Sequence, residues 1–537
     1  MKRLLPLLLC SFAWGQPLRD AAAQRGVLIG AAVAPSYFNE APYAATLAGE
    51  FSQVEPENDL KFGPTQPGPT TYTFTNADAI VNFAHAHKMA IRGHTLVWYQ
   101  QNPSWLNPLS PEALAQAMHD HISTVVGRYA GQIYAWDVVN EAFNDNGTPR
   151  TTLWSVNDGY IEQAFRWAHE ADPNALLFYN DYNGETVNAK SDAIYKMVQD
   201  FRARGVPIHG VGMQMHFTAS EPSMASIEAN MKRLTDLGLQ VHITEFDVRL
   251  QVDASGIATA SALATQAKIY GDVVAVCLKF PGCTAIQTWG LTDKHSWIPG
   301  SFQGFGAGLP FDAAYNAKPA HDAMITSMRT APPVISAAGL VNAAGYTGGA
   351  VAPGEIVVLF GATYGPAEFA TAGVRVLFDG IPAPLIYARV GQVSAVVPFE
   401  LAGKTSTTVQ YEYQGVVSNS VVLPVRDAVP GIFTLDASGT GPGAILNAST
   451  YAVISKTNPA HAGDYLAIYA TGIANPVSVT IAGVDCPVQY AGQAPGLIAG
   501  AGQINVQVPA GVAPGEQEIV VTAAGAKSQP GVIVSIR

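Results

Sequence analysis

Between residues 25 and 330, short apolar runs of strand type alternate with stretches in which apolar residues recur at helical spacing. The helical spacing is clearest in 111–127 and 159–171. Most of the strand-like runs are too apolar to have one face in water, which indicates a parallel sheet covered on both sides. The predicted strands are 27–33, 51–58, 89–97, 134–141, 176–183, 210–216, 239–247 and 283–290.

Strands alternating with helices in this number predict an α/β fold, a closed (β/α)8 TIM barrel spanning residues 16–330. An open doubly wound sheet is the alternative, but such sheets usually carry a glycine-rich phosphate loop, which this sequence lacks. Nearly every predicted strand ends in polar residues, and barrel active sites are built at the carboxyl ends of the strands. These strand ends hold Glu57 and Asn58, His94, Asn140 and Glu141, Asn180 and Asp181, Gln214 and His216, Glu245 and Asp247, and Trp289.

Residues 331–537 have a different sequence pattern, with short alternating strands and frequent turns. This region begins with a segment rich in alanine, proline and glycine. The segment "PGEIVVLFGA" near residue 353 is matched by "AGDYLAIYAT" near 462, and the segments that begin at 380 and 483 are also alike. A repeat of this length suits two β-sandwich-like units better than a solenoid. We therefore expect an all-β region of two repeats, at 331–430 and 431–537.

The first fifteen residues, "MKRLLPLLLCSFAWG", combine two basic residues, an apolar run and small residues. This order predicts a signal peptide at 1–15, cleaved after Gly15, and a secreted protein. The apolar run is far shorter than the roughly 20 residues of a membrane span. A lipoprotein signal is disfavoured because Leu9 stands before Cys10 where a small residue is preferred. We expect no membrane span elsewhere in the chain.

Composition excludes more than it identifies. A hydrophobic content of 48% with 13% charged residues excludes a largely disordered chain. The net charge of −12 argues against nucleic acid or an anionic membrane as partners, because phosphate binding needs clustered basic residues.

Three cysteines remain after removal of the signal peptide. Cys277 lies on an amphipathic stretch and Cys283 begins the next predicted strand, so a tight turn can bring the two within bridging distance. We expect a disulfide there rather than two buried thiols, since export makes disulfides possible. Cys486 is left without a partner and is expected to be a small buried side chain.

Glu141 ends one predicted strand, and Glu245 in "ITEFDV" lies at the end of another on the opposite side of the barrel. Two carboxylates that flank a scissile bond are the minimal machinery of glycoside hydrolysis. A lone glutamate would more simply form a salt bridge, but the neighbours favour sugar chemistry. Asn140 can bind a sugar hydroxyl and His216 can orient a nucleophile. Flat apolar faces come from Trp98, Trp289 and Trp297, and hydrogen-bond donors from His94, Lys61 and Gln214.

The stretch from about 25 to 330 resembles the family 10 glycoside hydrolases, typified by endo-1,4-β-xylanases. The resemblance extends through several motifs in the same order, so it is far more specific than a single "NE" pair. The motifs are "PENDLKF" (56–62), "RGHTLVWYQQNPSWL" (92–106), "WDVVNEAFNDNG" (136–147), "YNDYN" (179–183), "GVGMQMH" (210–216), "ITEFDV" (243–248) and "TWGLTDKHSWIPG" (288–300).

The resemblance places the acid/base on Glu141 and the nucleophile on Glu245. It implies a retaining enzyme that cleaves xylan internally by double displacement, with no metal and no organic cofactor. Xylan is expected before cellulose, because bulky tryptophans would crowd the hydroxymethyl group that glucose has and xylose lacks. The family's disulfide position coincides with Cys277 and Cys283. Its substrate-binding positions coincide with Glu57, Asn58, Lys61, His94, Trp98, Gln101, Asn140, Gln214, His216, Trp289 and Trp297.

Two residues depart from the family pattern. Tyr99 stands where a histidine is usual, beside the glycone subsite, and Phe62 stands where a tryptophan is common. The all-β region holds no tryptophan, so a role in binding sugars is less expected than a role as spacer or in surface attachment. Tyr411 and Tyr413 would be available if it does bind sugar, but "VQYEY" (409–413) is more simply an alternating strand with one face in the core. Two other hypotheses stay open: a catalytically inactive carbohydrate-binding barrel, and an adhesion protein in which the repeat is the main functional part.

Overall fold

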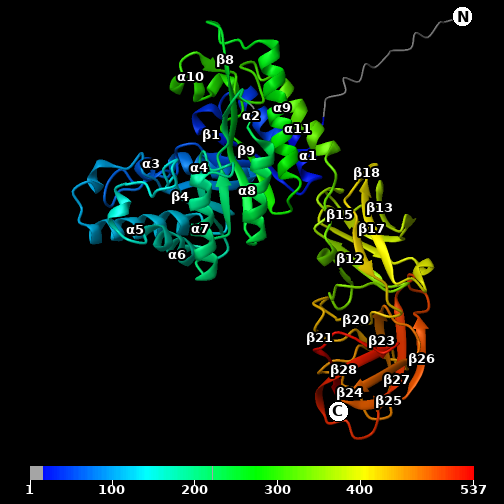
Figure 1. Cartoon of the computed structure of the whole chain (residues 1–537). Helices are drawn as coiled ribbons and strands as arrows, with labels where there is room; N and C mark the ends of the chain where they lie inside the picture. The colour runs from blue at the N-terminus through cyan, green and yellow to red at the C-terminus, as the bar shows by residue number, and fades with distance from the viewer. Residues whose placement is uncertain (1–15, 221) are drawn as a thin grey trace, which may run out of the picture. The chain divides into compact units, whose positions relative to one another are not determined.

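The computed structural model describes residues 16–220 and 222–537, which form two compact units (Figure 1). The first unit runs from residue 16 to Ala23 and from Val27 to Thr330. The second comprises Gln24–Gly26 and Ala331–Arg537. The predicted signal peptide, residues 1–15, lies outside the described residues. None of the described helices is long and apolar enough to cross a membrane.

The first unit contains a closed barrel of parallel strands, as predicted. The ring runs β1–β2–β3–β4–β5–β6–β8–β9 and closes where β9 pairs with β1. The short strands β7 and β10 pair with β8 outside the ring. The bounds are β1 Leu28–Val33, β2 Gln53–Pro56, β3 Ala90–Val97, β4 Ala135–Asn140, β5 Leu176–Asp181, β6 Gly210–Met213, β7 His216–Thr218, β8 Gln240–Gln251, β9 Cys283–Thr288 and β10 Phe305–Gly306.

Packing inside the ring explains why its strands read as continuous apolar runs. All residues of β2 and β4 are buried, because side chains fill the barrel on one face and helices cover the other. Gly93 in β3 is required by this packing: a Cβ atom there would lie 2.2 Å from the ring of Trp136. Substitution of Gly93 would therefore displace a fully buried tryptophan.

Helices follow the strands, and both helices predicted from periodicity are present as α5 and α6. The start of α5 has a local cause: Ser110 caps it by accepting a hydrogen bond from the Ala113 N–H, and Pro111 occupies the first turn. The bounds are α1 Leu18–Ala23, α2 Ala41–Glu50, α3 Phe62–Thr65, α4 Thr75–Ala86, α5 Pro111–Arg128, α6 Tyr160–Ala171, α7 Ala189–Ala203, α8 Met224–Asp236, α9 Ala260–Cys277, α10 Ile298–Ser301 and α11 Pro319–Thr330.

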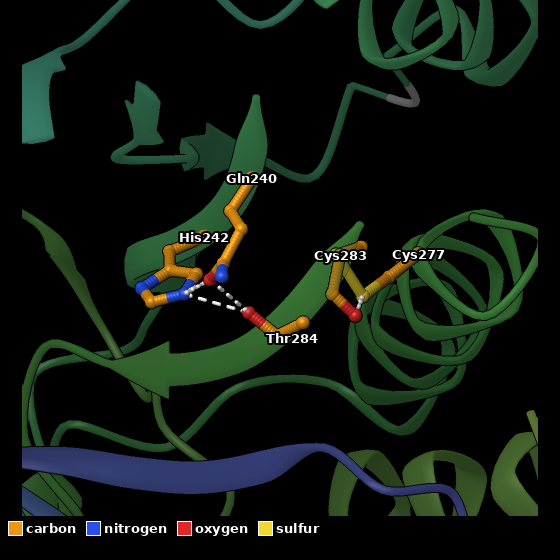
Figure 2. The surroundings of a disulfide bond; sticks show 5 residues. All are labelled: Gln240, His242, Cys277, Cys283 and Thr284. Carbon is orange, nitrogen blue, oxygen red and sulfur yellow. Dashed lines mark hydrogen bonds between the residues drawn. A yellow bond between two sulfur atoms is a disulfide. The ribbon is translucent and has the colours of Figure 1, made fainter. Parts of the chain in front are cut away.

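The predicted disulfide is present between Cys277, the last residue of α9, and Cys283, the first residue of β9 (Figure 2). The two Cα atoms lie 5.4 Å apart across the tight turn. Cys283 begins its strand, so the disulfide lies at the amino-terminal end of the barrel, away from the rim where a site is expected. Cys486 is buried and unpaired, as expected.

The second unit is all-β, as predicted, and its first part has two sheets around one core. One sheet has the order β11–β12–β16–β15, and the other has β14–β13–β17–β18 with β19 also paired to β17. The bounds are β11 Leu340–Asn342, β12 Ile356–Phe360, β13 Val374–Phe378, β14 Ile381–Pro382, β15 Leu385–Arg389, β16 Gln392–Val396, β17 Ser406–Tyr413, β18 Val416–Val417 and β19 Val421–Pro424.

The second part repeats this plan around a core of its own. Its sheets have the orders β20–β23–β27–β26, with β22 paired to β23, and β21–β30–β28–β24–β25, with β29 paired to β28. The bounds are β20 Gly431–Ile432, β21 Gly441–Pro442, β22 Ile445–Asn447, β23 Tyr465–Thr471, β24 Val477–Ile481, β25 Val484–Cys486, β26 Val488–Gln493, β27 Gly502–Gln507, β28 Gly515–Ala523, β29 Ala526–Lys527 and β30 Val532–Ile536.

The internal repeat extends to a local irregularity of the backbone. The β15–β16 pairing shifts register between Leu385 and Tyr387, and the β26–β27 pairing shifts between Val488 and Tyr490. A β-bulge bends and twists a strand at a defined point. Its recurrence at matching positions agrees with the sequence repeat.

The alternating strand with one core face expected at 409–413 is confirmed as part of β17, and its buried face carries Tyr411 and Tyr413, so neither is available for sugar contact. Both side chains point into the core of the first sandwich, where they are 0% and 5% exposed. Their strand β17 alternates between buried and partly exposed residues, and both tyrosines fall on the buried face.

Candidate active site

All the side chains predicted to act in catalysis or substrate binding line one cleft of about 590 Å³ in the first unit. The cleft lies at the carboxyl ends of the barrel strands, because Glu141 directly follows β4 and Trp289 directly follows β9. The cleft is also lined by residues absent from the predicted set: Tyr99, Gln100, Tyr182, Asn183, Arg249, Ser301 and Phe302.

Glu141 is held by its backbone and by its side chain. Its φ of 58° lies in the left-handed region, which is unusual for a residue with a side chain. The Glu141 N–H donates to the carbonyl of Asn180 (2.9 Å), and its carbonyl accepts from Arg150 Nε (2.9 Å). Its Oε1 accepts from Gln214 Nε2 (3.0 Å) and from Asn140 Nδ2 (3.3 Å). Glu141 as a residue is 7% exposed, and these bonds fix its carboxyl group at the cleft.

Glu245 is held within β8 by a different set of donors. Its Oε1 accepts from Asn180 Nδ2 (2.8 Å), and its Oε2 lies 3.1 Å from His216 Nε2. The other nitrogen of His216 lies 3.0 Å from Asp247 Oδ2, which also accepts from Trp297 Nε1 (2.8 Å). Glu245, His216 and Asp247 thus form a connected carboxylate–imidazole–carboxylate chain.

The charges along this chain favour an ionised Glu245. Burial alone would lower the pKa of His216, but the charges of Asp247 and Glu245 and the hydrogen bonds to them raise it to about 10. The imidazole is therefore a cation at neutral pH. Burial alone would raise the pKa of Glu245, but the hydrogen bond from His216 and the electrostatic influence of His94 hold it below its usual value.

Asn180 connects the surroundings of the two glutamates. Its Nδ2 donates to Asn140 Oδ1 (3.0 Å) as well as to Glu245, and its Oδ1 accepts from Thr244 Oγ1 (2.7 Å). Gly212 makes room for this amide, since a Cβ atom there would lie 2.2 Å from Asn180 Oδ1. The sequence indicated Asn180 as a polar strand end, but not as a residue of the site.

Polar side chains with aromatic neighbours form one part of the cleft wall. Asn58 Oδ1 accepts from Lys61 Nζ (3.0 Å) and from Gln101 Nε2 (3.3 Å). The same ammonium lies 4.9 Å from the ring centre of Trp98 and 5.7 Å from that of Trp289. This wall combines hydrogen-bond donors with flat apolar faces, as binding of a sugar ring requires.

Burial and the acidic side chains of the cleft have opposite effects on the pKa of Lys61. Burial lowers the pKa of Lys61, while the carboxylates of Glu245, Glu57 and Glu141 oppose that change. Burial also raises the pKa of Glu57, and Lys61 opposes that change in turn.

A charged layer inside the barrel lies beneath the cleft. His94 Nδ1 lies 3.0 Å from Asp137 Oδ2 and 3.4 Å from Glu55 Oε1. Burial and the charge of Asp137 raise the pKa of Glu55 well above its usual value. Glu55, His94 and Asp137 are close enough together to hold a metal ion. However, Arg92 pairs with Asp137 and lies 3.8 Å from Glu55, so the protein supplies the positive charge itself and we assign no metal there.

The two departures from the family pattern lie in different surroundings. Tyr99 lines the cleft. Phe62 is buried outside it and stacks on His121, with ring centres 3.7 Å apart, so this departure belongs to the packing of the barrel.

A parallel barrel whose rim holds two buried glutamates and a wall of tryptophans and sugar-type donors defines a glycoside hydrolase. The sequence model for glycosyl hydrolase family 10 matches residues 17–327, and the chain belongs to that family. The match ends before Ala331, so the all-β part of the second unit lies outside it.

Similar proteins are named as xylanases. Endo-1,4-beta-xylanase B of Thermotoga neapolitana is 40% identical over 331 residues, which cover 60% of this chain and 95% of the relative. Endo-1,4-beta-xylanase D of Talaromyces funiculosus is 40% identical over 321 residues, covering 58% of this chain and 78% of the relative. The crystal structure of xylanase 10B from Thermotoga petrophila RKU-1 in complex with xylobiose is 40% identical, with a TM-score of 0.57, and the match covers 59% of this chain and 98% of that one.

Proposed function

We propose that this chain is an exported, retaining endo-1,4-β-xylanase, with Glu245 as nucleophile and Glu141 as acid/base. The observation that carries the proposal is that the two carboxyl groups accept hydrogen bonds from different kinds of donor. Glu245 accepts from a protonated His216 and an amide, whereas Glu141 accepts from two neutral amides. Different surroundings for two nearby carboxyl groups are how such sites divide nucleophile from acid.

In the first half-reaction, the ionised Glu245 attacks the anomeric carbon of the bound sugar and forms a glycosyl-enzyme. Protonated Glu141 donates its proton to the leaving glycosidic oxygen, so that the departing sugar leaves as a neutral alcohol. The amides of Asn140 and Gln214, which bond Glu141 Oε1, hold the carboxyl group in place for this transfer.

In the second half-reaction, Glu141 acts as a carboxylate and removes a proton from water, which attacks the anomeric carbon. The bond to Glu245 breaks and that carboxylate is regenerated beside His216. Two inversions give net retention. This mechanism requires the two carboxyl groups to lie roughly 5–5.5 Å apart.

Three observations support xylan as the substrate and export as the location. Trp289 and Trp297 line the cleft and leave little room for a hydroxymethyl group, and Trp297 is held in place by its bond to Asp247. The similar proteins described above are named as xylanases. The Cys277–Cys283 disulfide fits an oxidising compartment, as the sequence pattern of residues 1–15 also does.

The direct test compares soluble xylan with soluble cellulose derivatives and follows the products. We expect short xylo-oligosaccharides of several lengths from xylan, much slower release from cellulose, and first-formed products in the β-anomeric form by proton NMR. Faster cleavage of cellulose would overturn the substrate assignment, and α-anomers would overturn the retaining mechanism.

We further propose that the second unit contacts polysaccharide or a cell surface. The supporting observation is a row of aromatic side chains on the first sandwich, here called the aromatic strip: Tyr346, Phe360, Phe369 and Tyr387. The ring centres of Tyr346 and Phe360 lie 6.2 Å apart, and those of Phe369 and Tyr387 lie 5.5 Å apart. Gln392, opposite Phe360 in the sheet, donates to the Tyr387 hydroxyl (2.8 Å). Tyr346, Phe360 and Phe369 are exposed and Tyr387 is partly exposed, and exposed aromatic groups of this kind mark interaction surfaces.

Depletion of the protein by insoluble xylan tests this second role, with Glu245→Ala as the background so that the polymer is not consumed. Replacing Phe360 and Phe369 by alanine should reduce the bound fraction. Tyr451→Ala is the matched control, because Tyr451 is an exposed aromatic residue of the second repeat outside the strip. Equal binding by the strip variant and the control would remove the strip from the proposal.

A further inference from the structure

The cleft residue Tyr99 packs its ring against Arg150. The Arg150 Cζ lies 4.4 Å from the centre of the Tyr99 ring, and the Tyr99 hydroxyl accepts from Gln100 Nε2 at 2.5 Å. A guanidinium over an aromatic face is attracted by the negative charge density of the ring, and the attraction is stronger where water is excluded. Arg150 is partly buried here, so the Tyr99 ring is one of the contacts that surround its guanidinium.

Arg150 uses its other atoms to hold the chain just after β4. Its Nε donates to the carbonyl of Glu141 (2.9 Å), and its Nη2 donates to the carbonyl of Phe143 (3.1 Å) and to the hydroxyl of Tyr182 (3.1 Å). These bonds fix the segment that carries Glu141. That segment needs fixing, because Glu141 has the left-handed φ of 58° that residues with side chains rarely adopt.

We propose that Tyr99 is a positioning residue for the acid/base. The face of its ring holds the Arg150 guanidinium in the plane from which it bonds the Glu141 carbonyl, and this sets the direction of the Glu141 carboxyl group. Tyr99 takes no part in proton transfer itself. The inference rests on the proposed role of Glu141 and extends it to a residue at which this chain departs from the family pattern.

A positioning role for Tyr99 and a sugar-binding role for Tyr99 predict different effects on two kinds of substrate. Loss of the ring face would let Arg150 move and would misalign Glu141, which matters only where the leaving group needs a proton. A xylo-oligosaccharide needs that proton, whereas a dinitrophenyl glycoside leaves without it. A direct contact between Tyr99 and the glycone-side sugars, which both substrates share, would instead affect both substrates alike.

The experiment compares kcat/KM for xylopentaose and for dinitrophenyl β-xylobioside in four proteins: the full chain, Tyr99→Ala, Tyr99→Phe and Phe302→Ala. We expect Tyr99→Ala to lower kcat/KM for xylopentaose about tenfold, part of the 10²- to 10⁴-fold that general acid catalysis supplies, and to leave the activated substrate nearly unchanged. Tyr99→Phe keeps the ring and should stay close to the unaltered chain on both substrates.

Phe302→Ala is the matched control. Phe302 also lines the cleft and also stacks on an arginine, with Arg249 Cζ 4.2 Å from its ring centre, but Arg249 has no bond to Glu141 among the described residues. This variant should not reproduce the Tyr99→Ala pattern, because it removes a cleft ring without removing a contact to the arginine that bonds Glu141.

Equal losses on both substrates in Tyr99→Ala, or no loss on either, would overturn the positioning role. If the alanine variant does not fold, Tyr99→Leu, which keeps bulk without an aromatic face, gives the same comparison. Failure of the unaltered chain to cleave xylopentaose would count against the proposed function instead, so the two failures are distinguishable.

Discussion

His216 is the side chain whose removal tests the electrostatics of the site most sharply. It lies between two carboxylates, 3.1 Å from Glu245 and 3.0 Å from Asp247, and its side chain is 16% exposed. Those partners raise its pKa to about 10, so it carries a positive charge at neutral pH. His216→Ala removes this charge and one hydrogen bond from the proposed nucleophile.

The expected effect follows from the strength of that bond. A hydrogen bond to a charged group contributes about 1.5–3 kcal/mol, and one pKa unit corresponds to about 1.4 kcal/mol. The pKa of Glu245 should therefore rise by roughly one to two units in the variant, since the Asn180 bond and the influence of His94 remain. Glu245 must be ionised to attack, so the variant should lose activity at a higher pH than the unaltered chain does.

The assay is the pH dependence of kcat/KM for xylopentaose, which reports ionisation in the free enzyme. The acidic limb should move to higher pH by about one to two units. His295→Ala is the control, because His295 bonds Glu40 and lies outside the cleft lining. A uniform loss of activity with an unmoved acidic limb would refute the reasoning, since it would mean that His216 aligns Glu245 without setting its charge.

Three further predictions concern other parts of the chain. Burial raises the pKa of Glu355, in the first sandwich, to about 8 from an ordinary 4.5. The folded state therefore keeps a proton that the unfolded state releases, and stability should fall by a few kcal/mol as pH rises from about 4.5 to 8. Thermal unfolding of Glu355→Gln, measured across the same pH range, should show no such fall in stability. An equal fall in the variant would contradict this prediction. Glu141→Ala should still cleave dinitrophenyl β-xylobioside and, with added azide, should yield a β-glycosyl azide; inactivity on that substrate would contradict its acid/base role. The fragment 16–330 should fold and hydrolyse soluble xylan nearly as fast as the full chain, because all cleft residues lie within it; a folded but inactive fragment would show that the second unit is part of the working enzyme.

The barrel could be predicted because its strands are buried on both faces and so leave a continuous apolar pattern. The two glutamates could be located because polar residues at strand ends are costly unless they face a cleft. The link through Asn180 could not be predicted, since it depends on which way an amide turns between neighbouring strands. The role of Arg150 could not be predicted either, because its side chain donates to the backbone carbonyl of Glu141, nine residues earlier in the chain.

The alternation at 409–413 predicts a strand with one face in the core, and β17 confirms it. The pattern alone does not say which face carries the tyrosines, so the burial of Tyr411 and Tyr413 is a finding of the structure. The aromatic strip was missed because its members come from β12, β15 and two loops, which only the fold brings together.

The measurement that tests the central claim most directly is covalent trapping of the nucleophile. A 2-deoxy-2-fluoro-xylobioside with a dinitrophenyl leaving group should form a glycosyl-enzyme that hydrolyses slowly, because fluorine at that position destabilises both transition states. Mass spectrometry of the intact protein should show one added xylobiosyl group, and peptide mapping should place it on Glu245. A label on any other residue, or no label on a protein that hydrolyses xylan, would contradict the account.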